Sequence, residues 1–152
     1  FVDDYQFNRL WTNPDAYLEK LRRFQYVFTP DFSPYADFPK AVQVFNHFRK
    51  HWIGAYLQEN GVRVIPTVTW SYPPSYDFCF DGEPKNSVVA ISSVGCMKSK
   101  RNKQMLIDGY NEMVKRLEPS CIIFYGMVPD ECKGNIIRVK PFQNKFKKAV
   151  CG

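Results

Sequence analysis

The sequence has no apolar run approaching the roughly 18 residues that a membrane-spanning helix needs. It also has no two cysteines in C-x-x-C spacing, although it contains five cysteines. An odd number without that spacing argues against a disulfide framework and a cysteine zinc site, and it favours a reduced, cytoplasmic setting. Internal repeats and low-complexity segments are absent as well, so solenoid and linker classes are excluded.

Apolar and aromatic residues are plentiful instead. They make up 45% and 16% of the 152 residues, which suits a chain that buries a core. A chain of this length is most simply one domain. We predict one domain over residues 1–142, followed by a basic tail over residues 143–152. The chain starts without Met or a basic region, so we expect the domain to be trimmed at its N-terminus.

The net charge of +6 belongs to the C-terminal end of the chain. Residues 1–132 hold 15 basic and 15 acidic side chains, which cancel, whereas the last 20 residues hold six basic and no acidic ones. Such a segment suits a polyanion such as nucleic acid, or it is a solvated tail. The residues that we expect to contact nucleic acid are Lys140, Lys145, Lys147 and Lys148.

Short β-branched runs alternate with helical patterns along the chain. Strands are expected near residues 1–5, 25–29, 62–69, 87–92, 121–125 and 136–139. Apolar side chains recur every three or four residues in between, which predicts helices over residues 14–24, 37–60 and 99–117. The alternation predicts an α/β fold with about six mostly parallel strands, either a partial or degenerate barrel or an open three-layer sheet.

The expected strands end in polar or aromatic clusters, where α/β proteins place their sites. Asp4 and Asp31 would meet at this edge of the sheet. Paired carboxylates hold a hard divalent cation or divide acid and base roles, so we take both as candidate catalytic residues. The alternative is that both are ordinary turn residues. No cofactor motif is evident, and a divalent metal is the cofactor that this pair would accept.

A second candidate site follows the strand expected at residues 87–92. There a loop of small residues leads into a helix, whose free N–H groups and dipole favour an anion. The glycine spacing and GK[ST] ending of a Walker motif are absent, and a solvated basic helix start is the alternative. The candidate ligand-binding residues, including two from neighbouring strand ends, are Ser92, Ser93, Gly95, Lys98, Lys100, Arg101, Trp70 and Tyr125.

Three further features have both a functional and a structural interpretation. His47 and His51 have metal-chelating spacing, but no Glu stands between them and two adjacent basic residues disfavour a cation. Cys79 and Cys96 would be nucleophiles only if a base or a helix end lowered their pKa; buried, inert cysteine is the alternative. The aromatic loop of residues 71–86 forms either a lid or pocket wall, or it packs onto the sheet.

Three blocks of the sequence stand out together. They are residues 1–7 with Trp11 and Asn13-Pro14, residues 29–33, and residues 78–87, and Ile65-Pro66 and Tyr125-Gly126 fit the same pattern. The combination resembles a family of bacteria, phages and mobile elements catalogued as domain of unknown function 4417, and the similarity covers nearly the whole chain. The resemblance implies a phage or mobile-element context, carries no assigned activity and transfers no catalytic residue.

The leading hypothesis is a protein that binds or acts on nucleic acid or a phosphate-bearing ligand at the carboxyl ends of the strands. One alternative is a non-enzymatic module that binds a host or defence protein. Another is a small-molecule enzyme that uses the paired carboxylates. The sequence does not decide between an enzyme and a binding module, and it gives no oligomeric state.

Overall fold

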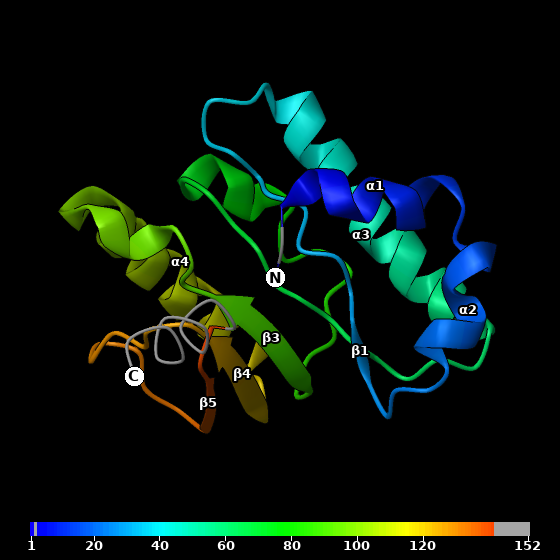
Figure 1. Cartoon of the computed structure of the whole chain (residues 1–152). Helices are drawn as coiled ribbons and strands as arrows, with labels where there is room; N and C mark the ends of the chain where they lie inside the picture. The colour runs from blue at the N-terminus through cyan, green and yellow to red at the C-terminus, as the bar shows by residue number, and fades with distance from the viewer. Residues whose placement is uncertain (2, 142–152) are drawn as a thin grey trace, which may run out of the picture.

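The computed structural model describes residue 1 and residues 3–141 of the chain (Figure 1). In chain order its helices are α1 (Asp4–Thr12), α2 (Asp15–Leu21), α3 (Lys40–Glu59) and α4 (Lys100–Leu117). The strands are β1 (Val27–Phe28), β2 (Val64–Ile65), β3 (Val88–Ser92), β4 (Cys121–Tyr125) and β5 (Ile136–Val139). Two short 3₁₀ helices are η1 (Pro73–Asp77) and η2 (Cys96–Lys98).

The strands form two small parallel sheets that a single bridge joins. β1 pairs with β2, and β3, β4 and β5 pair in that order. A parallel bridge between Thr67 and Ala90 connects the chain after β2 to β3. Pro66 has no N–H for the ladder, so β2 ends before it, and its carbonyl accepts from the Ala90 N–H at 2.8 Å. The predicted α/β class with mostly parallel strands is confirmed.

The described residues do not confirm every detail of the predicted sheet. They contain five strands rather than about six, and no pairing of β5 with β1 closes a barrel. The strand end predicted at residues 1–5 is wrong, because α1 begins at Asp4. Phe7, Leu10 and Trp11 pack against one apolar cluster. Leu10 and Trp11 lie three and four residues after Phe7, which is the spacing of one face of a helix.

Other elements form where the local pattern predicts them. Gly61 follows α3 with a φ of 80°, a conformation that glycine adopts readily at a helix end. The Ser99 hydroxyl accepts from the Asn102 N–H at 3.1 Å and caps α4. β4 and β5 have the predicted bounds, and β3 starts one residue later than predicted.

Two apolar clusters pack against the two sheets. One joins α4 to β3 and β4 and includes Ile91, Leu106, Tyr110, Met113 and Phe124. The other lies where α1, α2 and α3 meet β1 and β2, and its buried members are Phe32, Ile53, Leu57 and Val62. Figure 1 shows α4 on one side of the molecule, apart from the group of α1, α2 and α3.

The aromatic loop of residues 71–86 belongs to the first of these clusters. Cys79 and Phe80 are buried in it, and Tyr76 packs against it. Arg116 of α4 fixes the loop from outside, since its guanidinium donates to the Tyr76 carbonyl at 2.6 Å. Tyr76, Cys79 and Phe80 thus pack this loop onto the cluster. No helix among the described residues is long and apolar enough to cross a membrane.

Candidate functional site

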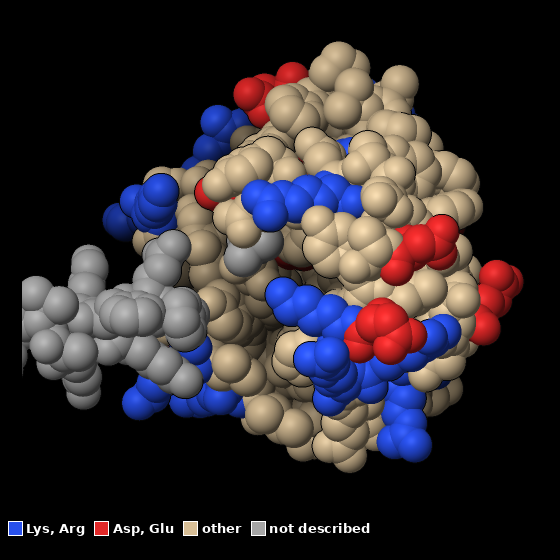
Figure 2. All heavy atoms as spheres, turned by 45° about the vertical axis from the view of Figure 1, so that its right-hand side comes forward, with Lys and Arg blue, Asp and Glu red and all other residues tan. Residues whose placement is uncertain are grey.

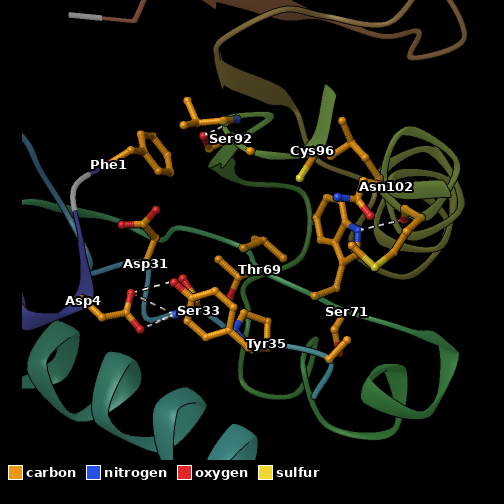
Figure 3. Close-up of a pocket in the computed structure, with 18 of the residues that line it drawn as sticks. Phe1, Asp4, Asp31, Ser33, Tyr35, Thr69, Ser71, Ser92, Cys96 and Asn102 are labelled. Carbon is orange, nitrogen blue, oxygen red and sulfur yellow. Dashed lines mark hydrogen bonds between the residues drawn. The ribbon is translucent and has the colours of Figure 1, made fainter. Parts of the chain in front are cut away.

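A cavity of about 620 Å³ lies at the carboxyl ends of β1 and β3, beside the chain that follows β2 (Figure 3). Its wall includes six residues that the sequence predicts for a site: Asp4, Asp31, Trp70, Ser92, Gly95 and Lys98. They come from the ends of β1 and β3 and the loops that follow them, from the chain after β2, and from the start of α1. The structure thus brings these residues together, while their roles in binding or catalysis stay predictions.

Ser93 and Tyr125 stand next to the cavity but do not line it. Ser93 is buried, and its N–H donates to the Tyr125 carbonyl at 3.0 Å. A Cβ on Gly126 would lie 2.4 Å from the Ser93 hydroxyl, so this close approach needs glycine. Tyr125 stacks on Phe1 with ring centroids 4.9 Å apart, and Phe1 lines the cavity. Both predicted residues therefore support the wall from behind.

The remaining predicted basic residues lie away from the cavity wall. Lys100 is exposed in the first turn of α4, and the Arg101 guanidinium lies 5.1 Å from the ring centre of Tyr72. Lys140 is exposed just after β5. The predicted nucleic-acid contacts Lys145, Lys147 and Lys148 lie outside the described residues, as does the proposed tail.

The carboxylate of Asp4 is held in place by Ser33. The Ser33 N–H donates to Oδ2 at 3.0 Å, and the Ser33 hydroxyl donates to Oδ1 at 3.1 Å. Asp4 lies in the first turn of α1, where the helix dipole favours a negative charge. Figure 3 shows Asp4 and Asp31 on the same wall of the cavity. The expected pair of carboxylates forms, although a helix rather than a strand presents Asp4.

Asp31 has an unusual protonation equilibrium. Burial raises its pKa from 3.8 to about 7, and the negative charge of Asp4 adds to the rise. A carboxyl group with a pKa near neutrality is well matched to general acid or base catalysis. Asp31 is therefore the stronger of the two catalytic candidates.

Trp70 forms an aromatic wall that α4 is shaped to receive. The Trp70 Nε1–H donates to the Met105 carbonyl at 3.3 Å. A Cβ on Gly109 would stand 2.0 Å from the same nitrogen, so the indole occupies the space of the missing side chain. A glycine inside a helix costs up to about 1 kcal/mol relative to alanine. Here it allows close packing of Trp70 on α4.

Across the cavity from the two carboxylates lies a more basic wall. It is formed by the loop after β3 and the start of α4, with Ser92, Gly95, Lys98 and Asn102. Figure 3 shows Cys96 and Asn102 opposite Asp4 and Asp31. On the face in Figure 2, lysine and arginine side chains lie beside a hollow in the surface. The cavity is thus polarised, with acidic groups on one side and a lysine on the other.

The two cysteines that the sequence suggests as nucleophiles have the wrong electrostatics. Burial raises the pKa of Cys79 to about 12, and burial also raises the pKa of Cys96. A nucleophilic cysteine needs the opposite shift. Their surroundings fit the inert interpretation.

The cavity includes residues that sequence reasoning missed. Tyr35 follows Asp31 in the same loop. A search that continued a few residues further past the end of the expected strand would have found it. Asn102 lies in the first turn of α4, at the helix start where the sequence predicts a ligand site, so the same prediction could have included it. Phe1 reaches the cavity only because α1 replaces the expected strand, and no local pattern indicates that.

The family model for a domain of unknown function, DUF4417, matches residues 1–143. The chain belongs to this family. The Gene 1 protein of Mycobacterium phage L5 is 41% identical over 128 residues, which are 84% of this chain and 56% of that relative. The Gene 1 protein of Mycobacterium phage D29 is 40% identical over 126 residues, which are 83% of this chain and 47% of that relative. No solved structure matches the chain.

These comparisons confirm the family resemblance and its phage association. The chain spans about half the length of the curated relatives it matches. The activity of a DUF4417 protein as a whole is therefore a matter for proposal.

Proposed function

We propose that the cavity binds a phosphate-bearing ligand and that Asp31 exchanges a proton with it. The observation that carries the proposal is the polarity of the cavity, which sets a carboxyl group of near-neutral pKa against a wall containing Lys98. The volume of about 620 Å³ falls in the range of small-molecule sites, about 300–1,000 Å³. A nucleotide is the class of ligand that best fits this size and polarity.

The two walls suggest how such a ligand would lie. Its phosphate would face Lys98 and Asn102, where the start of α4 adds backbone N–H groups. Its ring would contact Trp70 or Tyr35, because aromatic faces stack on bases regardless of sequence. A hydroxyl or amino group at the other end would then reach Asp31, which accepts or returns the proton.

Binding of a divalent cation is the competing role for the two carboxylates. Oδ1 of Asp4 accepts from both the N–H and the hydroxyl of Ser33, whereas Oδ2 accepts one hydrogen bond, from the Ser33 N–H, and retains a lone pair for a further partner. A Mg²⁺ ion bound there would bridge the carboxylates to a ligand phosphate. The two roles separate on titration: a bridging cation makes ligand affinity depend on Mg²⁺, and Asp31→Asn then removes that dependence.

The decisive test is calorimetric titration with inorganic phosphate and with nucleoside mono- and triphosphates. Lys98→Ala should weaken binding of the best ligand about tenfold or more, as expected for loss of a charge-assisted contact. Lys100→Ala is the matched control, since Lys100 carries the same charge two residues away but does not line the cavity. Equal weakening by both variants, or no binding of any of these ligands, would reject the proposal.

Nucleic acid as the phosphate-bearing ligand calls for a second experiment. The basic residues of the tail would supply sequence-independent phosphate contacts. Binding to single- or double-stranded DNA should then fall with salt, and neutralising Lys145, Lys147 and Lys148 should flatten that salt dependence. Binding that does not respond to salt or to these substitutions would exclude this form of the proposal.

A separate observation favours a protein-binding function. The aromatic surface of α3, formed by Phe45, Phe48 and Trp52 together with Trp11 of α1, is a connected set of ring contacts. Phe45 and Phe48 are 47% and 52% exposed. Contiguous exposed apolar surface of this kind marks interaction sites in soluble proteins.

The aromatic surface can be tested against an aromatic residue elsewhere. Phe48→Asp should abolish copurification of any bacterial host protein that binds this surface, because it places a charge in an apolar contact. Tyr26→Asp is the control, since Tyr26 is 52% exposed and lies outside the surface. Host proteins retained by both variants would show that the aromatic surface of α3 is not their binding site.

A further inference from the structure

We infer that α3 and the loop packed against it carry a transition-metal site of the zinc type, made by His47, His51 and Glu83. One ligand atom from each of these side chains lies within 4.8 Å of those of the other two. The site is separate from the cavity, because none of the three residues lines it. Two histidines and one carboxylate form a common three-residue ligand set for zinc, which leaves a fourth position open.

α3 supplies the two imidazoles in suitable positions. His47 and His51 lie one helical turn apart, and their ring centroids are separated by 4.4 Å. His47 Nε2 lies 3.0 Å from the Asp81 carbonyl oxygen. With the proton on that nitrogen, His47 donates to the carbonyl and presents Nδ1 to a metal. Metal-bound histidines commonly have their second nitrogen fixed in this way.

Glu83 comes from the turn of the aromatic loop, far from the histidines in sequence. Gly82 brings the loop against α3: a Cβ on Gly82 would lie 3.4 Å from the His51 ring. The Glu83 side chain is fully buried, and Oε1 lies 3.4 Å from His51 Nε2. The third ligand, which α3 itself does not provide, is therefore supplied by tertiary structure.

Two buried polar atoms at this position lack a hydrogen-bond partner among the described residues. They are Oε2 of Glu83 and Nε2 of His51. Leaving such a buried atom unsatisfied destabilises the folded state. A metal ion bound to both atoms would satisfy them together. This observation, rather than the presence of two histidines, points to a ligand.

Neighbouring basic residues do not exclude a cation here. Lys50 is ion-paired with Oε1 of Glu83 and donates to the Thr67 carbonyl at 3.0 Å, so its ammonium group is held by these partners. Arg49 points to another part of the molecule, where it donates to Asn8 and lies over the Phe32 ring. A bound ion would use Oε2 of Glu83 and leave the ion pair with Lys50 intact. His51, whose side chain is 31% exposed, would hold it at the solvent boundary.

Titration of the intact chain with Zn²⁺ and Co²⁺ tests the site. His47 and His51 are the two histidines of the sequence, so imidazole NMR signals report on it directly. We expect both sets of signals to shift on addition of one equivalent of Zn²⁺, and bound Co²⁺ to show no thiolate charge-transfer absorption. Zn²⁺ should also raise the melting temperature, since a ligand of the folded state stabilises it.

Variants separate this site from the cavity and from adventitious binding. His47→Ala and His51→Ala should each weaken Zn²⁺ binding at least about tenfold and abolish the rise in melting temperature. Asp31→Asn is the control and should leave Zn²⁺ affinity unchanged. The inference is overturned if Zn²⁺ does not bind, if Asp31→Asn weakens binding as much as the histidine variants do, or if Co²⁺ shows thiolate ligation. Circular dichroism of each variant confirms that it is folded.

Discussion

The single residue with the clearest consequence for stability is Asp31. Its pKa is about 7 in the folded protein, against an ordinary value of 3.8. The folded state therefore binds this proton more tightly than the unfolded chain does. The stabilisation is complete below about pH 4 and is lost as the pH rises through about 7. Above that pH the buried carboxylate destabilises the fold.

Asp31→Asn should remove this dependence on pH. Relative to the variant, the wild type should lose up to about 4 kcal/mol of unfolding free energy between about pH 4 and pH 8, since one pKa unit corresponds to about 1.4 kcal/mol. Urea unfolding of both proteins across this range measures the effect. A difference between the two proteins that stays constant with pH would contradict the raised pKa.

The buried ion pair of Lys50 and Glu83 makes a second prediction at the residue scale. Their side chains are 2% and 0% exposed. Burial raises the pKa of Glu83, but the attractions of Lys50 and His51 together outweigh burial and hold the pKa below its ordinary value. The stability that Glu83 contributes is therefore present above its ordinary pKa and is lost as the pH falls.

Removing one member of this pair leaves the other charge buried alone. Glu83→Leu and Lys50→Met should each lower the free energy of unfolding by about 3–5 kcal/mol, whereas the double variant should recover much of that loss. Denaturant unfolding of the four proteins in a chelating buffer measures the coupling. Single effects that simply add in the double variant would show that the pair is not coupled.

Among the elements, α4 depends on one glycine for its contact with Trp70. Gly109→Ala improves helix propensity by up to about 1 kcal/mol, but its Cβ would lie 2.0 Å from the indole nitrogen. The steric clash should prevail, with a net destabilisation of about 1–3 kcal/mol and an altered Trp70 fluorescence signal.

A second substitution in α4 isolates the steric term. Asn111→Ala adds helix propensity at an exposed position and should be neutral or slightly stabilising. Unfolding free energies and fluorescence spectra of both variants check the prediction. A Gly109→Ala protein as stable as Asn111→Ala, with unchanged fluorescence, would show that Trp70 does not need this space.

Elements with a strong local pattern were predictable from the sequence, and α1 was not. β4 has the predicted bounds, because a β-branched run between turn residues fixes it locally. In residues 1–11 the spacing of the apolar residues is compatible with either a helix or a strand. The choice is made by tertiary contacts, such as Trp11 against Trp52 at 5.3 Å between ring centroids. Contacts of that kind leave no trace in a local window of sequence.

For the whole molecule, the order of parallel strands made the cavity predictable. Sites at the carboxyl ends of neighbouring strands meet, and Asp31, Trp70 and Ser92 therefore line one cavity. The meeting of Glu83 with His47 was not predictable, because it depends on how the aromatic loop folds back onto α3. Residue types and spacing identify the candidate site residues at the strand ends. They do not identify the residues that a long loop places against a helix.

At this scale the polarised cavity is distinct from the aromatic surface of α3, because none of the four residues of that surface lines the cavity. The predicted basic tail lies outside the described residues. The central claim therefore concerns the cavity alone.

Backbone amide NMR of the chain during titration with ATP or inorganic phosphate tests that claim most directly. If the cavity binds phosphate as proposed, the largest shift changes will lie in residues 31–35 and 92–102 and will weaken in Lys98→Ala but not in Lys100→Ala. Shift changes confined to residues 140–152, or no shift changes at all, would contradict the assignment of the cavity as a phosphate-ligand site.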